Sequence, residues 1–199
     1  VEILVDRIMA ERNPADRQKT LKRLSYVMQH LFGDLFEKES FDDARRLIDE
    51  GGKWFRFLNT ALDTLNPHVV KTAVMDLGFE AGFYGLRTRD AAKAKYHCNI
   101  PWAILFDPTS ACNLHCIGCW AAEYGHTLNL SFDVMDKIVR EGKALGCHFY
   151  LLTGGEPLMR KKDILRLCRK HPDCEFHAFT NGNLFDDDFC AQVKDVGKL

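Results

Sequence analysis

The stretch Pro108-Thr109-Ser110-Ala111-Cys112-Asn113-Leu114-His115-Cys116-Ile117-Gly118-Cys119-Trp120 places three cysteines at C-x3-C-x2-C spacing. It follows the apolar run Trp102-Ala103-Ile104-Leu105-Phe106, which predicts a short buried strand between two prolines. The cysteines therefore lie on the loop after the carboxyl end of a strand, where α/β folds place their chemistry. Thiolates at such close spacing are typical of iron–sulfur loops, and three protein ligands on a four-iron cluster leave one iron open.

A structural zinc site, or a set of ordinary buried thiols, is the alternative interpretation of these cysteines. Zinc takes four ligands and usually receives them as two separated pairs. His115, His126 or Cys147 could supply a fourth ligand, but no second C-x2-C or H-x3-H pair follows in the sequence. The spacing alone therefore favours an iron–sulfur cluster and leaves zinc open.

The composition excludes several classes of protein. The 199 residues are 46% hydrophobic and 28% charged, as expected of a globular chain rather than a disordered one. The net charge of −1 argues against a nucleic-acid-binding surface. No apolar run reaches membrane-spanning length, and the first residues lack a signal-peptide pattern. Eight cysteines without a secretory signal indicate a reducing compartment, so we expect a cytoplasmic protein.

Residues 1–97 predict an all-helical amino-terminal region. Apolar residues recur at intervals of three and four through Leu21, Leu24, Met28 and Leu31, the spacing of one buried helix face. Gly51-Gly52 predicts the end of one helix, and Asn66-Pro67 predicts the start of another. The charged segment 87–99 is interpreted as a linker, which places the domain boundary near residue 97. We expect the helical region to be a scaffold or docking module.

Residues 98–199 alternate strand, loop and helix. The runs 148–152 and 175–179 predict two further buried strands, and a helix is predicted after each strand: from Ser131, over 161–170, and from the acidic cluster 186–188. This alternation predicts an α/β fold with parallel strands and right-handed crossovers.

Special loops follow the second and third predicted strands. Gly154-Gly155-Glu156-Pro157 comes after the second strand, and Thr180-Asn181-Gly182 comes after the third. Because the carboxyl ends of parallel strands share one edge of a sheet, we expect both loops to meet the cysteine loop. Paired glycines let a ligand approach the backbone closely, and Glu156 could hold an ammonium group. Taken singly, the two glycines could instead form a plain tight turn, and Glu156 could be a solvent-exposed charge on a loop.

The pair of motifs, Cys112-x3-Cys116-x2-Cys119 and Gly154-Gly155-Glu156-Pro157, resembles the radical S-adenosylmethionine (SAM) superfamily over roughly residues 100–196. In that family the three cysteines bind a 4Fe–4S cluster, whose open iron is chelated by the methionyl amine and carboxylate of SAM. The Gly-Gly-Glu-Pro loop contacts the methionyl amino group. One electron from the cluster cleaves SAM to methionine and a 5′-deoxyadenosyl radical, which abstracts hydrogen from a substrate.

The resemblance therefore implies Cys112, Cys116 and Cys119 as metal ligands, and Gly154, Gly155, Glu156 and Pro157 as SAM-binding residues. It also implies an electron donor of flavodoxin or ferredoxin type and a substrate that the sequence does not identify. The alternative function is a non-catalytic iron–sulfur or zinc module for electron transfer, scaffolding or sensing.

The sequence of residues 116–125, together with Asn99-Ile100-Pro101-Trp102 before it, is similar to that of a bacterial branch of this superfamily that is common in anaerobes. It is more loosely similar to the SPASM-like branch, whose members carry extra carboxy-terminal cluster domains. Many family members have an aromatic residue before the third cysteine to pack the adenine of SAM. Gly118 holds that place here, so either Trp120 substitutes or adenine is held differently.

The family barrel has six strand–helix units, and this sequence predicts three. We therefore expect residues 98–199 to be the first half of a radical SAM (β/α) barrel, and the chain to be an amino-terminal portion of a longer enzyme. Such a portion need not be active by itself.

Overall fold

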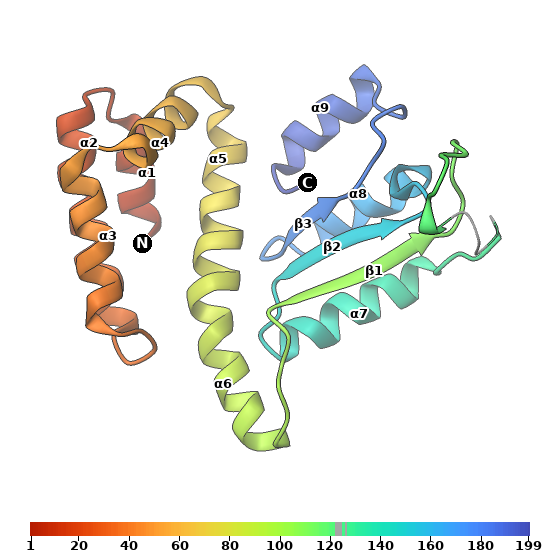
Figure 1. The fold of residues 1–199 in the computed structure, drawn as a ribbon, viewed down its shortest axis with the longest axis horizontal. Coiled ribbons are helices and arrows are strands. Elements are labelled where there is room, and N and C mark those ends of the chain that lie inside the picture. The colour runs from red at the N-terminus through yellow and green to blue at the C-terminus, as the bar shows by residue number, and fades with distance from the viewer. Residues whose placement is uncertain (122–124, 126) are drawn as a thin grey trace. The chain divides into compact units, whose positions relative to one another are not determined.

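In the computed structural model, which describes residues 1–121, 125 and 127–199, the chain separates into two units, Val1–Val74 and Met75–Leu199. The first unit is helical, as predicted. Its helices are α1 (Glu2–Ala10), α2 (Pro14–Phe32), α3 (Lys38–Glu50), α4 (Lys53–Thr64) and α5 (Pro67–Ala73) (Figure 1).

Local sequence signals set the helix ends of the first unit. The Asn66 side chain accepts hydrogen bonds from the backbone N–H groups of His68 and Val69, which caps α5. Gly51 ends α3 with a φ of 59°, a left-handed conformation that glycine adopts at little cost. Between the helices, the buried guanidinium of Arg17 donates to Asn59 at 2.5 Å and to Asp63 at 2.8 Å, which joins α2 to α4.

A π-helical segment, η1 (Val74–Tyr84), continues into α6 (Gly85–Tyr96). The predicted linker over 87–99 is therefore wrong for residues 87–96, which are helical. The physical reason is a buried arginine: Arg89 donates to the carbonyl oxygens of Ala81 at 3.1 Å and Gly146 at 2.7 Å. These contacts group α6 with the strands, so the two units divide at Val74–Met75, upstream of residue 97.

Three parallel strands form one sheet in the order β1 (Ala103–Thr109), β2 (Phe149–Gly154), β3 (Glu175–Ala178). Phe149 pairs with Ala103 on one side and with Glu175 on the other, so the strands start at one level. The mixed α/β fold with a parallel sheet is thus confirmed. Its extension to a six-unit barrel stays a prediction.

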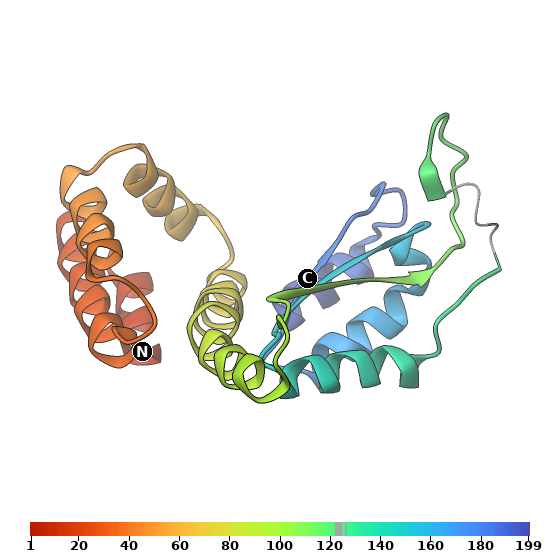
Figure 2. The same ribbon diagram turned by 60° about the horizontal axis from the view of Figure 1, so that its bottom comes forward.

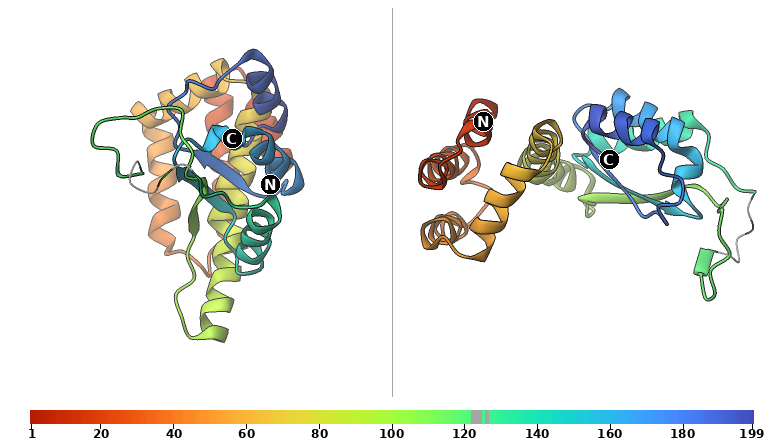
Figure 3. Two further views of the ribbon diagram at one scale, coloured as in Figure 1. Left: turned by 90° about the vertical axis from the view of Figure 1, so that its right-hand side faces the viewer. Right: turned by 90° about the horizontal axis from the view of Figure 1, so that it is seen from above.

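The remaining helices cover one face of this sheet (Figures 2 and 3). They are α7 (Phe132–Ala144), α8 (Lys161–Lys170), which follows the 3-10 turn η3 (Pro157–Arg160), and α9 (Asp187–Val196). The core between helices and sheet includes Met135, Val139, Tyr150, Ile164 and Phe176, all with 0% exposure. On the opposite face, Leu105 and Phe179 are 56% and 62% exposed.

Across the described residues, none of the helices combines the length and the apolar character that crossing a membrane requires.

Candidate functional site

The loop after β2 packs directly on the segment that leads into the cysteine loop. The backbone N–H of Gly155 donates to the Thr109 oxygen at 3.0 Å, and that of Glu156 donates to the Ala111 oxygen at 2.8 Å. Both glycines are required by this approach. A Cβ on Gly154, whose φ is +103°, would lie 2.5 Å from the Thr109 oxygen, and one on Gly155 would overlap the Ala111 oxygen.

The carboxylate of Glu156 is buried, with 1% of the residue exposed. Its Oε1 accepts hydrogen bonds from the Leu158 N–H at 2.9 Å and the Thr180 hydroxyl at 2.6 Å. Its Oε2 accepts from the Asn181 N–H at 2.8 Å. Donors of the chain itself thus reach both oxygens, while the contact of this carboxylate with an ammonium group stays a prediction. Glu156 holds the second and third loops together.

The third loop also contacts the cysteine loop. The Asn181 side chain donates from Nδ2 to Asn113 Oδ1 at 2.9 Å. Thr180 Oγ1 accepts from the Gly182 N–H at 3.0 Å, which shapes the turn. The expectation that all three loops meet at one edge of the sheet is therefore confirmed by hydrogen bonds that link each loop to the next.

The three cysteines lie on the outer part of the first loop. Cys112 is partly buried, whereas Cys116 and Cys119 are exposed. The backbone N–H of Cys119 donates to the Cys116 oxygen at 3.3 Å, across a turn in which Gly118 has a φ of +74°. The three sulfurs do not all lie within 4.8 Å of one another. A four-iron cluster binds each thiolate to a different iron, so its ligands stand further apart than those of a single ion.

The donor set fits an iron–sulfur cluster, and zinc with His115 of the same loop as a fourth ligand stays an alternative. Three accessible thiols on one loop are the ligands that such clusters use. Cys147, a possible fourth zinc ligand, is fully buried just before β2, at the opposite end of the sheet from the cysteine loop. His126 lies outside the described residues.

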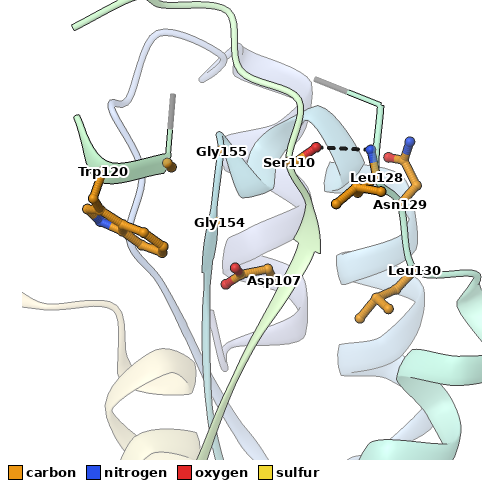
Figure 4. Close-up of a pocket in the computed structure, with 9 residues that line it drawn as sticks. Asp107, Ser110, Trp120, Leu128, Asn129, Leu130, Gly154 and Gly155 are labelled. Atoms are coloured by element: carbon orange, nitrogen blue, oxygen red, sulfur yellow. Dashed lines mark hydrogen bonds between the residues drawn. The ribbon is translucent and has the colours of Figure 1, made fainter. Parts of the chain in front are cut away.

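A cavity of about 460 Å³ lies beside these loops, in the size range of small-molecule sites. It is lined by the end of β1, the glycine turn, Trp120 and the segment 128–130 (Figure 4). Ser110 Oγ accepts from the Leu128 N–H at 3.0 Å and closes one wall. The sequence had indicated the glycines and Trp120. It had not indicated Asp107, although its position two residues after Leu105 places both on the open face of β1.

Asp107 is the acidic group of this cavity wall. Partial burial raises the pKa of its carboxyl above the usual value. The carboxylate lies against Gly154, where an added Cβ would be 3.1 Å from Asp107 Cγ. The cavity therefore combines an apolar aromatic wall, backbone polar groups and one carboxylate.

The family model of the radical SAM superfamily matches residues 106–199, so this part of the chain is similar to that superfamily. The chain is similar to GTP 3′,8-cyclase of Petrotoga mobilis (strain DSM 10674 / SJ95), at 30% identity over 95 residues, 45% of this chain and 29% of that protein. It is also similar to AdoMet-dependent heme synthase of Methanosarcina barkeri (strain Fusaro / DSM 804), at 28% identity over 103 residues, 50% of this chain and 29% of that protein. No solved structure matched the chain.

Proposed function

We propose that this chain is part of a radical SAM enzyme in which Cys112, Cys116 and Cys119 bind a 4Fe–4S cluster and Gly154–Pro157 binds SAM. The observation that carries the proposal is that hydrogen bonds connect the three loops. Glu156 connects the second loop to the third, and Asn181 connects the third loop to the cysteine loop. The chemistry that bound cluster and SAM supply in this superfamily is reductive cleavage to a 5′-deoxyadenosyl radical, which abstracts hydrogen from a substrate.

In this proposal the residues of the chain bind SAM and orient it in the cavity. The paired glycines keep the backbone of the loop close to the end of β1, which places the loop on the wall of the cavity where the methionyl end of SAM would bind. Glu156 acts as a positioning residue, since its carboxylate fixes this loop to the third one. Trp120 lies on the cavity wall and offers an aromatic face for adenine. It would replace the aromatic side chain that many family members have before the third cysteine, where this chain has Gly118.

The substrate stays unassigned. The two relatives are named for different reactions, and the chain covers 29% of each, so their names support the shared radical chemistry rather than a particular substrate. We propose a flavodoxin- or ferredoxin-type protein as the electron donor and a cytoplasmic location. A non-catalytic iron–sulfur module is the second candidate, because the three thiols of one loop could bind a cluster whether or not SAM binds.

Anaerobic reconstitution with iron and sulfide, followed by electron paramagnetic resonance of the reduced protein, tests the proposal. We expect a 4Fe–4S signal that changes when SAM is added, because SAM takes the open coordination position of one iron. A 4Fe–4S signal that is indifferent to SAM would favour the non-catalytic module. A protein that takes up zinc tightly and assembles no cluster would refute both iron-based functions.

A further inference from the structure

A second group of metal-ligating side chains lies at the other end of the sheet. His148 immediately precedes β2, and Asp173 and Cys174 immediately precede β3. One ligand atom from each residue lies within 4.8 Å of the other two. The tails of the β2 and β3 arrows lie side by side, away from the loops that follow the strands (Figure 1). A six-residue strand spans about 20 Å, so the group is remote from the cysteine loop.

The histidine is held in one orientation. His148 is 4% exposed, and its Nδ1 lies 2.9 Å from the carbonyl oxygen of Asp173. When Nδ1 carries the proton and donates to this oxygen, Nε2 carries the lone pair. Histidines that bind metals are commonly oriented in this way, with the second ring nitrogen donating to a carbonyl or carboxylate.

The carboxylate of Asp173 has one oxygen to spare. Lys143 Nζ lies 2.5 Å from Oδ1, whereas Oδ2 lies 3.8 Å from His148 Nδ1. Burial opposes ionisation of Asp173, but the hydrogen bond and charge of Lys143 outweigh it and lower the pKa of the carboxyl. Its side chain is 37% exposed, which leaves a route for an ion from solvent.

Cys174 completes a donor set of nitrogen, oxygen and sulfur. The residue has 0% exposure, and burial raises the pKa of its thiol far above the usual value. A bound cation would take the place of the thiol proton. A further carboxyl group, Glu80 on η1, is partly buried and interacts electrostatically with His148 and Asp173.

We propose that His148, Asp173 and Cys174 bind a zinc ion that joins the amino ends of β2 and β3. Imidazole, carboxylate and thiolate are the ligands that Zn²⁺ takes in proteins, and three of them leave a fourth position for water or Glu80. The charges balance, because one carboxylate and one thiolate neutralise the ion while Lys143 and Glu80 offset each other. The site is independent of the proposed radical chemistry.

Cobalt(II) in the place of zinc provides the test, since a thiolate ligand gives it a strong near-ultraviolet charge-transfer band. The parent protein carries Cys112→Ser, Cys116→Ser and Cys119→Ser, which removes the other set of thiols. We expect this parent to bind one Co²⁺ with a thiolate band that Zn²⁺ abolishes. Cys174→Ala should remove the band, and His148→Ala should weaken binding about tenfold or more.

Cys168→Ala is the matched control, because Cys168 is an equally buried thiol on α8 outside the group. This variant should bind Co²⁺ as the parent does. If Cys174→Ala fails to fold, Asp173→Asn, a change at a partly exposed position, tests the proposal in its place. This variant should bind Co²⁺ about tenfold or more weakly, as expected for His148→Ala. The proposal is overturned if the parent shows no thiolate band, if Cys168→Ala loses the band, or if a folded Asp173→Asn or Cys174→Ala protein binds Co²⁺ unchanged.

Discussion

The backbone N–H of Asn181 donates a 2.8 Å hydrogen bond to Oε2 of Glu156, so the loop after β3 is held by a side chain of the loop after β2. The other carboxylate oxygen accepts from Thr180 and Leu158. The acidic residue of the Gly-Gly-Glu-Pro motif is thus an internal support of the site in this chain.

Replacing Glu156 by alanine should separate cofactor binding from cluster assembly. The N–H groups of Leu158 and Asn181 would lose their acceptor, at a cost of about 1–3 kcal/mol in the free energy of unfolding. We expect full iron content, SAM affinity reduced about tenfold, and a lower melting temperature. Iron analysis, SAM titration and thermal unfolding measure the three effects. Glu141→Ala, an exposed position on α7, is the control, and an unchanged SAM affinity in Glu156→Ala would contradict the positioning role.

Each of Cys112→Ala, Cys116→Ala and Cys119→Ala should abolish assembly of the cluster, because a cluster with two protein thiolates is poorly held. Iron and sulfide analysis after anaerobic reconstitution measures the loss. Cys98→Ala removes an exposed thiol outside the loop and should reconstitute fully. A Cys116→Ala protein with full iron content would argue against the assignment of the three ligands.

Gly155→Ala should disrupt the site through backbone displacement. The added methyl group would overlap the Ala111 oxygen and force the glycine loop away from the cysteine loop. We expect destabilisation of about 1–3 kcal/mol and loss of SAM binding. Gly78→Ala is a matched change in η1, where an added Cβ meets nothing within 4 Å, and it should be neutral or stabilising. Urea unfolding and SAM titration compare the two variants, and equal behaviour would show that the close approach is not required.

The buried pair of Asp76 and Lys198 should give stability a specific pH dependence. Lys198 Nζ lies 2.6 Å from Asp76 Oδ2, yet burial outweighs the lysine and raises the pKa of Asp76 from 3.8 to about 6. Between these values the folded protein holds a proton that the unfolded chain releases. The free energy of unfolding, taken relative to Asp76→Asn, should therefore fall as the pH rises through this window.

Urea unfolding of wild-type protein and Asp76→Asn at a series of pH values measures this difference. Contributions from groups remote from Asp76 cancel in the comparison. A difference that is constant or that increases with pH would show that the carboxyl is not protonated more readily in the folded state.

The sequence predicted the parallel strands, several helix ends and the meeting of the three loops, because these follow from local signals and from the geometry of strand–helix units. Ser131, for example, caps α7 by accepting from the Val134 N–H, as its place before an apolar helix indicates.

What could not be predicted depends on partners distant in the sequence. The role of Glu156 is set by Thr180 and Asn181, which no local pattern connects to it. The helical state of residues 87–96 rests on the burial of Arg89 against Gly146, 57 residues later. The His148–Cys174 group likewise forms only when two strand starts are brought side by side.

The contact between Arg89 and Gly146 limits how this protein can be shortened. Gly85 and Gly146 also approach so closely that a Cβ on either would lie 2.5 Å from the carbonyl oxygen of the other. A truncated chain that begins at residue 98 would lose Arg89 and leave Lys198 without Asp76. Expression trials and domain exchanges should therefore retain the helix from Met75 onward as an integral part of the strand-bearing half.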